Sequence, residues 1–153
     1  MKKILYITLV LSISLFACTA KKETKKQRIK KTAAAVKEEV KIGDTVTLES
    51  GLRYKIVREG LGRKPKSSSR VRVHYEGTLD DGTVFDSSIA RGKPLVFGVG
   101  QVIKGWQEGL LLMKEGSVYE LYIPANLGYG SRAAGKIPPF SSLNFTVELL
   151  EVL

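Results

Sequence analysis

The fold of this chain is decided by the stretch Val71-Arg72-Val73-His74-Tyr75-Glu76-Gly77 and the residues that follow it. Val71, Val73 and Tyr75 fall on one face of an extended chain and the charged residues on the other, the pattern of a half-buried strand. Asp80-Asp81-Gly82 comes next, and Gly accepts the positive φ that a tight turn needs. We therefore predict a hairpin from this strand into Val84-Phe85.

Three other segments show the same two-residue period: residues 52–56, 119–123 and 143–149. The segment around Trp106 breaks it, because Trp106, Leu110 and Met113 fit helical spacing, and Gly116 is well placed to end that helix. Several strands and one short helix predict an α+β domain in which an antiparallel sheet of five to six strands folds over the helix.

The formal net charge of +10 is concentrated at the N-terminus. Residues 1–43 contain eleven Lys or Arg and three Glu, whereas residues 44–153 contain fourteen Lys or Arg against twelve acids. The globular part is therefore nearly neutral, and we predict no nucleic-acid partner. The basic segment either attracts anionic lipid headgroups or is a solvated spacer.

The first residues have the pattern of an export signal. Lys2 and Lys3 precede an apolar run over residues 4–16, which is too short to span a bilayer because that takes about 20 residues. The run ends in Leu15-Phe16-Ala17-Cys18, which resembles the bacterial lipobox, and Cys18 is the only cysteine. We predict a signal peptide over residues 1–17 and lipidation of Cys18; the alternative is ordinary cleavage beside an incidental cysteine. Two or three palmitate-like acyl chains would hold firmly, at about 0.8 kcal/mol per buried methylene.

The predicted mature chain has two parts: a polar, lysine-rich tether over residues 18–45 and a domain over residues 46–153. The export signal places the protein at the cell envelope. Thr19, rather than Asp, after the lipidated cysteine favours the outer membrane, with the domain facing the periplasm.

The domain lacks the side chains of several reaction classes. Residues 71–150 contain no cysteine, and His74 is the chain's single histidine. A thiol nucleophile and a His-rich metal site are therefore excluded there, and we expect neither a metal nor a cofactor. An apolar pocket with one or two placed polar groups remains.

Several motifs, in order and with fitting spacing, carry a family resemblance. They are Val73-His74-Tyr75, Phe85-Asp86-Ser87-Ser88, Val102-Ile103-Lys104-Gly105-Trp106, Tyr129-Gly130, Ile137-Pro138-Pro139 and Phe145-Thr146-Val147-Glu148-Leu149-Leu150. Over about residues 47–153 the chain resembles the FKBP-type peptidyl-prolyl cis–trans isomerases, and Gly51-Leu52-Arg53-Tyr54-Lys55 resembles their bacterial envelope branch. The resemblance implies a half-barrel wrapped around one helix, with an active site between them that rotates X–Pro bonds without a covalent intermediate.

The resemblance also implies roles for individual residues. Trp106 would form the floor under the proline ring, the backbone N–H of Ile103 and the hydroxyl of Tyr129 would bind the substrate amide, and Asp86 would be the polar wall. The other implied site residues are Phe85 as a catalytic wall residue and Tyr75, Arg91, Leu95, Val102, Ile137 and Phe145 as substrate-binding residues.

The residues alone leave alternatives to these roles. Tyr75, Trp106 and Phe145 could be plain core, Asp86 a turn or helix cap, and Arg91 a solvated surface residue. His74 is expected to be a satisfied strand residue facing away from the pocket.

The chain departs from the commonest family pattern at Leu95, where an aromatic wall residue often stands, and at Ala134 and Lys136 in the loop before Ile137. These positions ring the pocket mouth, where substrate preference and macrolide affinity are set.

The expected partners are proline-containing unfolded or exported polypeptides, the membrane through the lipid anchor, and macrolide inhibitors as candidate ligands. We expect a monomer, because no long N-terminal helix resembles the dimerisation arm of envelope relatives. The rival hypothesis is a low-activity chaperone or peptide-binding module that uses the same groove.

Overall fold

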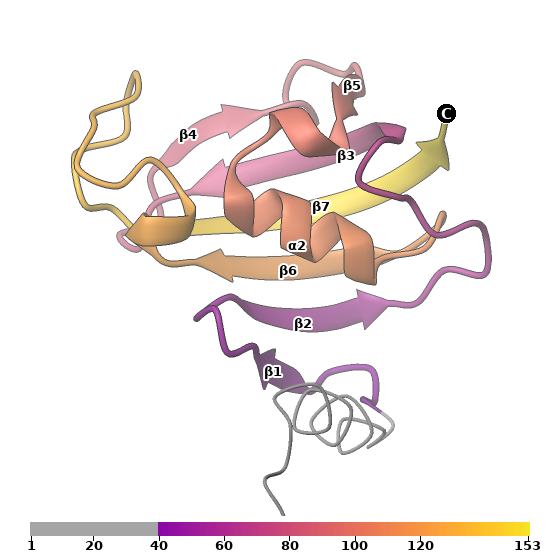
Figure 1. Cartoon of the computed structure of the whole chain (residues 1–153). Helices are drawn as coiled ribbons and strands as arrows, with labels where there is room; N and C mark the ends of the chain where they lie inside the picture. The colour runs from indigo at the N-terminus through magenta and orange to yellow at the C-terminus, as the bar shows by residue number, and fades with distance from the viewer. Residues whose placement is uncertain (1–39) are drawn as a thin grey trace, which may run out of the picture. The chain divides into compact units, whose positions relative to one another are not determined.

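Strand β3 (Arg70–Thr78) is the strand predicted from the opening stretch, and it lies inside an open antiparallel sheet (Figure 1). The structure is a computed structural model that describes residues 40–153. The predicted signal peptide, Cys18 and the tether as far as residue 39 lie outside the described residues. Within residues 40–153, no helix is both long enough and apolar enough to cross a bilayer.

The described sheet has seven strands. Six follow one another in the order β1 (Thr45–Thr47), β2 (Arg53–Arg58), β6 (Val118–Ile123), β7 (Leu143–Val152), β3 and β4 (Val84–Ser87). The seventh, β5 (Leu95–Gly98), pairs with β3. The sequence predicted five to six strands, and the sheet is an open half-barrel as expected. Strands β1 and β5, of three and four residues, are too short to show a clear two-residue period.

The chain joins the sheet slightly before the predicted domain start at residue 46. The backbone N–H of Gly43 donates to the carbonyl of Ile56 at 2.9 Å, and Thr45 pairs with Lys55 at the sheet edge. The last residues of the segment that we assigned to the tether therefore bond to the domain.

The predicted hairpin between β3 and β4 is confirmed. Thr78 pairs with Val84, and Gly82 has a φ of 83° in the turn between them. The Asp81 carboxylate accepts the backbone N–H of Thr83 at 2.8 Å, which holds the turn closed.

Strand β3 shares one of its edges between two short partners. Residues Arg70–Val73 pair with β5, whereas Glu76–Thr78 pair with β4. The gap between them is closed by Ser88, whose backbone N–H donates to the carbonyl of Tyr75 at 2.9 Å. This change of partner leaves Tyr75 at the point where the two short strands meet.

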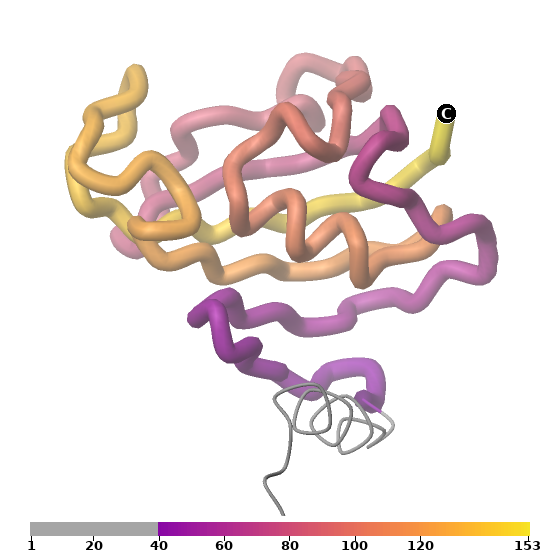
Figure 2. Tube along the Cα trace, in the orientation of Figure 1, coloured from indigo at the N-terminus to yellow at the C-terminus, as the bar shows by residue number. Residues whose placement is uncertain are grey.

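Helix α2 (Lys104–Leu112) lies across one face of the sheet, as Figures 1 and 2 show, and buries Trp106 and Leu110 against it. Two glycines allow the close approach. A Cβ at Gly105 would lie 2.5 Å from Ile123, and a Cβ at Gly109 would lie 2.7 Å from Leu121. Larger residues at these positions would push the helix away from β6.

The helix ends earlier than predicted. Met113 is already extended, with φ −76° and ψ 158°, and its side chain is fully buried. Gly116, which we expected to end the helix, instead has a φ of 88° in the turn before β6, where its N–H donates to Leu149. Two 3₁₀ turns, η1 (Val99–Gln101) and η2 (Ala125–Leu127), complete the described helical segments.

Candidate active site

A pocket of about 580 Å³ opens between the start of α2, the strands β3 to β5 and the loop that follows η2. Its volume is in the range of small-molecule sites, which run from roughly 300 to 1,000 Å³. The lining residues are Tyr75, Phe85, Asp86, Phe97, Gln101, Val102, Ile103, Trp106, Tyr129, Ala134, Gly135, Lys136, Ile137 and Phe145. Nine of the eleven residues that the sequence placed in the site are in this list; Arg91 and Leu95 are not.

Trp106 lies at the bottom of an aromatic cluster. Its ring meets those of Tyr75, Phe97 and Phe145 nearly at right angles, with centroids 5.3, 5.7 and 5.3 Å away. Edge-to-face pairs of this kind contribute about 0.5–1.5 kcal/mol each beyond their buried area. Trp106 is only 4% exposed, so it belongs to the core and lines the pocket at once. The two interpretations of Trp106 from the sequence, as a core residue and as part of the site, are therefore compatible.

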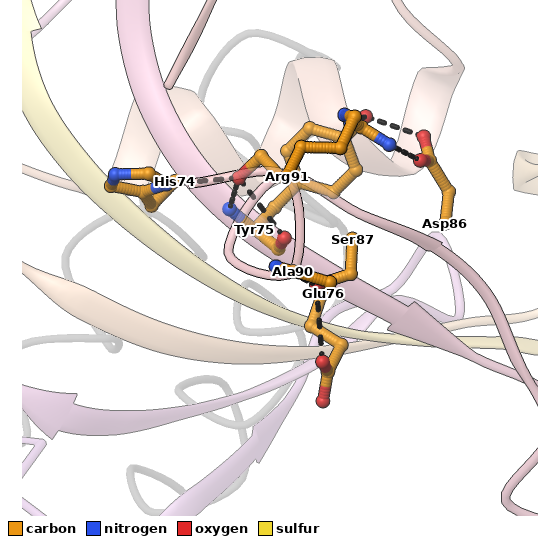
Figure 3. A network of polar contacts seen from close by, with 8 residues as sticks. His74, Tyr75, Glu76, Asp86, Ser87, Ala90 and Arg91 are labelled. Carbon is orange, nitrogen blue, oxygen red and sulfur yellow. Dashed lines mark hydrogen bonds and ion pairs between the residues drawn. The ribbon is translucent and has the colours of Figure 1, made fainter. Parts of the chain in front are cut away.

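Asp86 is held by two partners at the side of the pocket, as Figure 3 shows. The hydroxyl of Tyr75 donates to its Oδ2 at 2.5 Å, and Nη1 of Arg91 donates to its Oδ1. Arg91 Nη2 also donates to the Tyr75 hydroxyl at 3.1 Å, so the three side chains form a closed network. The Asp86 side chain is thus part of this network, and the turn that follows β4 is closed by Ser87, whose Oγ accepts the backbone N–H of Ala90 at 3.1 Å.

The network fixes the charges of its members. Burial opposes ionisation of Asp86, but the hydrogen bonds from Tyr75 and Arg91 and the nearby positive charge outweigh it and lower its pKa. The pKa of Tyr75 is raised, first by burial and then by its hydrogen bond to the Asp86 carboxylate. At neutral pH the pocket wall thus presents an anion whose charge is balanced by Arg91 and a neutral phenol that donates to it.

Behind this network, Ser88 fixes the backbone of Tyr75. The Ser88 hydroxyl accepts the N–H of Tyr75 at 2.7 Å, donates to its carbonyl at 3.2 Å and lies 3.1 Å from Nδ1 of His74. The Ser88 hydroxyl therefore ties the side chain of His74 to the backbone of Tyr75. His74 does not line the pocket. Within residues 40–153, no three His, Cys, Asp or Glu side chains are grouped so that they could hold a metal ion.

Among residues 40–153, the backbone N–H of Ile103 and the hydroxyl of Tyr129 have no protein partner in the pocket lining, and neither has the buried indole N–H of Trp106. Ile103 is the residue before α2, and the side chain of Gln107 braces this turn by donating to the carbonyl of Val102 at 2.7 Å. The Tyr129 side chain is 42% exposed. The backbone N–H of Ile103 and the hydroxyl of Tyr129 remain available to a ligand.

Leu95, which the sequence analysis placed in the pocket wall, does not line the pocket. Leu95 pairs with Val73 at the start of β5 and packs against the core. Phe97, two residues later on the same strand, contributes the aromatic wall instead. The sequence reasoning missed Phe97, Gln101 and Gly135; for Phe97, the two-residue spacing from Leu95 was the available signal. Arg91 acts behind the lining through Asp86 and Tyr75.

The pocket and the sheet around it match a known family. A sequence profile of the FKBP-type peptidyl-prolyl cis-trans isomerases matches residues 62–150. The chain belongs to this family.

Individual FKBP-type relatives are similar over most of the chain. The FKBP-type 22 kDa peptidyl-prolyl cis-trans isomerase of Escherichia coli is 51% identical over 134 residues, a match that covers 84% of this chain and 65% of that protein. The outer membrane protein MIP of Legionella longbeachae is 52% identical, with 70% of this chain and 46% of that protein covered. This chain thus spans less than two thirds of the length of either relative.

Solved FKBP structures agree with the fold. The crystal structure of FkpA from Escherichia coli superposes with a TM-score of 0.69 at 45% identity, covering 83% of this chain and 56% of that one. That of AtFKBP13 gives a TM-score of 0.68 at 40% identity, covering 72% of this chain and 99% of that one. Among the positions where this FKBP departs from the common pattern, Ala134 and Lys136 line the pocket and Leu95 does not.

Proposed function

We propose that this protein is a peptidyl-prolyl cis–trans isomerase that rotates X–Pro bonds in the pocket above Trp106. The observation that best supports this proposal is the aromatic cluster around Trp106, which lies beside the fixed Asp86 carboxylate. The cluster offers a proline ring an apolar surface, while the polar groups lie along one side of it.

The chemistry requires no nucleophile. An X–Pro bond resists rotation because resonance makes it partly double, with a barrier of about 18–20 kcal/mol, and uncatalysed isomerisation takes tens to hundreds of seconds. Resonance places negative charge on the carbonyl oxygen, and water stabilises that charge. An apolar pocket weakens this stabilisation of the planar amide, whereas twisting the bond removes the resonance itself.

Fixed dipoles would then favour the twisted amide. The unpaired N–H of Ile103 is available to a substrate carbonyl, and the Tyr129 hydroxyl is available to the amide region. The Asp86 carboxylate, oriented by Tyr75 and Arg91, supplies a fixed negative charge at the wall. Groups that need no rearrangement during the reaction are the ones that lower a barrier most.

The test is the cis-to-trans rate of a Leu-Pro tetrapeptide in the presence of the purified protein. We expect acceleration by the wild type and a large loss in Trp106→Ala and Asp86→Ala, with circular dichroism to show that each variant is folded. A wild-type rate equal to that of the free peptide would refute the proposal.

A second candidate is a peptide-binding module with little catalysis. Its supporting observation is exposed apolar surface around the loop after η2, where Phe140 is 74% exposed and Tyr129 42%. This candidate predicts that proline peptides bind but are not accelerated, so the same assay separates the two.

We further propose that the protein acts on exported polypeptides at the cell envelope and is anchored there through Cys18. The support is the lipobox-like sequence before Cys18 and the similarity to a relative named outer membrane protein MIP. Replacing Cys18 with Ser should move the protein from the membrane fraction to the soluble fraction. If Cys18→Ser remains membrane-bound after a salt wash, lipidation at Cys18 is not the main anchor.

Macrolides are candidate inhibitors of this pocket, because its aromatic lining and volume suit a large apolar ring. We propose that the protein acts as a monomer. Displacement of a proline peptide by a macrolide and sedimentation of the purified protein test these two points separately.

A further inference from the structure

Lys136 stands at the tip of a tight hairpin beside the pocket. The backbone N–H of Ala134 donates to the carbonyl of Ile137 at 3.0 Å, and the N–H of Ile137 donates back to Ala134 at 2.9 Å. Gly135 has a φ of 58°, whereas the φ of Lys136 is not positive, which fits a type II′ turn with Gly in its first central position. Two reciprocal hydrogen bonds and a glycine turn therefore fix the backbone that carries Lys136.

Lys136 supplies the only uncompensated charge in the pocket lining. The lining contains two charged residues, Asp86 and Lys136. The Asp86 carboxylate is bonded to Tyr75 and paired with Arg91. The side chain of Lys136 is exposed and forms no ion pair or hydrogen bond with any residue between 40 and 153. A substrate bound over Trp106 thus meets a net positive charge at the mouth.

We propose that Lys136 is a specificity residue that favours an acidic side chain immediately before or after the substrate proline. The inference rests on the proposed isomerase function and adds a substrate class to it. The proline ring occupies the aromatic part of the pocket, so its neighbours along the peptide lie at the mouth, within reach of a flexible lysine. Because both charges remain hydrated, the advantage is modest, about two- to fivefold, the range of exposed ion pairs.

The experiment compares kcat/KM for peptides that differ only in one carboxylate: Glu against Gln before the proline, and Glu against Gln after it. At low ionic strength we expect a Glu-to-Gln ratio of about two to five at one or both positions. The ratio should fall towards one as salt is added, because the Debye length shrinks from about 30 Å at 0.01 M to about 3 Å at 1 M. Lys136→Met should bring the Glu-to-Gln ratio to about one, and Lys136→Glu should bring it below one, so that the ratio rather than the absolute rate is the readout.

Lys64→Glu is the matched control. Lys64 is another exposed lysine without an ion pair among residues 40–153, and it lies in the loop between β2 and β3, outside the pocket lining. The Lys64→Glu substitution changes the net charge by the same amount as Lys136→Glu. The proposal is overturned if the Gln peptides are accelerated but the Glu peptides show no advantage, if Lys136→Met keeps the advantage, or if Lys64→Glu removes it equally. If no peptide is accelerated, the isomerase function itself fails.

Discussion

Replacing Arg91 with Met tests whether the ordered Asp86 carboxylate contributes to catalysis. The change removes the ion pair with Asp86 and the hydrogen bond to the Tyr75 hydroxyl but keeps a long apolar side chain. The paired side chains of Arg91 and Asp86 are 46% and 40% exposed, so solvent screens their interaction. We therefore expect the free energy of unfolding to fall by no more than about 1 kcal/mol.

The effect on kcat/KM should be larger than the effect on stability. Asp86 loses one of its two side-chain partners, and a hydrogen bond to a charged group contributes about 1.5–3 kcal/mol when well formed. After discounting for exposure we expect about 1–2 kcal/mol, which corresponds to roughly a five- to thirtyfold lower kcat/KM. The assay is the cis-to-trans rate of a Leu-Pro peptide, with unfolding followed by the fluorescence of Trp106, the chain's single tryptophan.

The same variant should change the pH profile. In the wild type the pKa of Asp86 is below its ordinary value of 3.8, so its contribution to stability and activity is present above that pH and is lost as pH falls through the lowered pKa. Without Arg91 the pKa rises, and the acid limb of the pH–rate profile should move to higher pH.

Arg72→Met is the matched control. Arg72 pairs with Glu151 between β3 and β7, and their side chains are 44% and 43% exposed, close to the values of the Arg91 pair. We expect a similar small loss of stability and an unchanged kcat/KM. The reasoning is refuted if Arg72→Met lowers kcat/KM as much as Arg91→Met, or if Arg91→Met keeps full activity and an unshifted acid limb.

Two further substitutions test the packing and the backbone around the pocket. A Cβ at Gly77 would lie 2.6 Å from Phe85 and 2.7 Å from Phe145, so Gly77→Ala should cost about 1–3 kcal/mol in denaturant unfolding and lower kcat/KM by displacing both rings. Unchanged stability and activity would contradict this packing argument. Phe140 has a φ of 60° and is 74% exposed, so Phe140→Asn should remove backbone strain of about 1 kcal/mol and raise the melting temperature by a few degrees. A lower melting temperature would show that the Phe140 side chain contributes more than its backbone costs.

The sequence predicted the elements whose side chains alternate over many residues. Strands β3, β6 and β7 place one residue in two in the core, and the turn at Gly82 has a chemical signature, so all four could be located. The short strands β1 and β5 could not, because three or four residues show no period and their pairing depends on distant partners.

The details of the site depend on tertiary structure. Nothing local indicates that β3 changes partner at Tyr75, or that Ser88 fills the gap. The aromatic wall of the pocket is formed by Phe97, two residues after the predicted wall residue Leu95, because the pairing of β5 with β3 places Phe97 next to Trp106. The end of α2 was misjudged because Gly116 satisfies the turn before β6 rather than a helix cap.

The central claim is that the pocket above Trp106 rotates X–Pro bonds without covalent chemistry, and exchange NMR on a Leu-Pro peptide tests it most directly. We predict that catalytic amounts of the protein raise the cis-to-trans and trans-to-cis rates by the same factor and leave the equilibrium populations unchanged. Trp106→Ala, if folded, should abolish most of this effect. Exchange rates equal to those of the free peptide in the presence of folded wild-type protein would contradict the account.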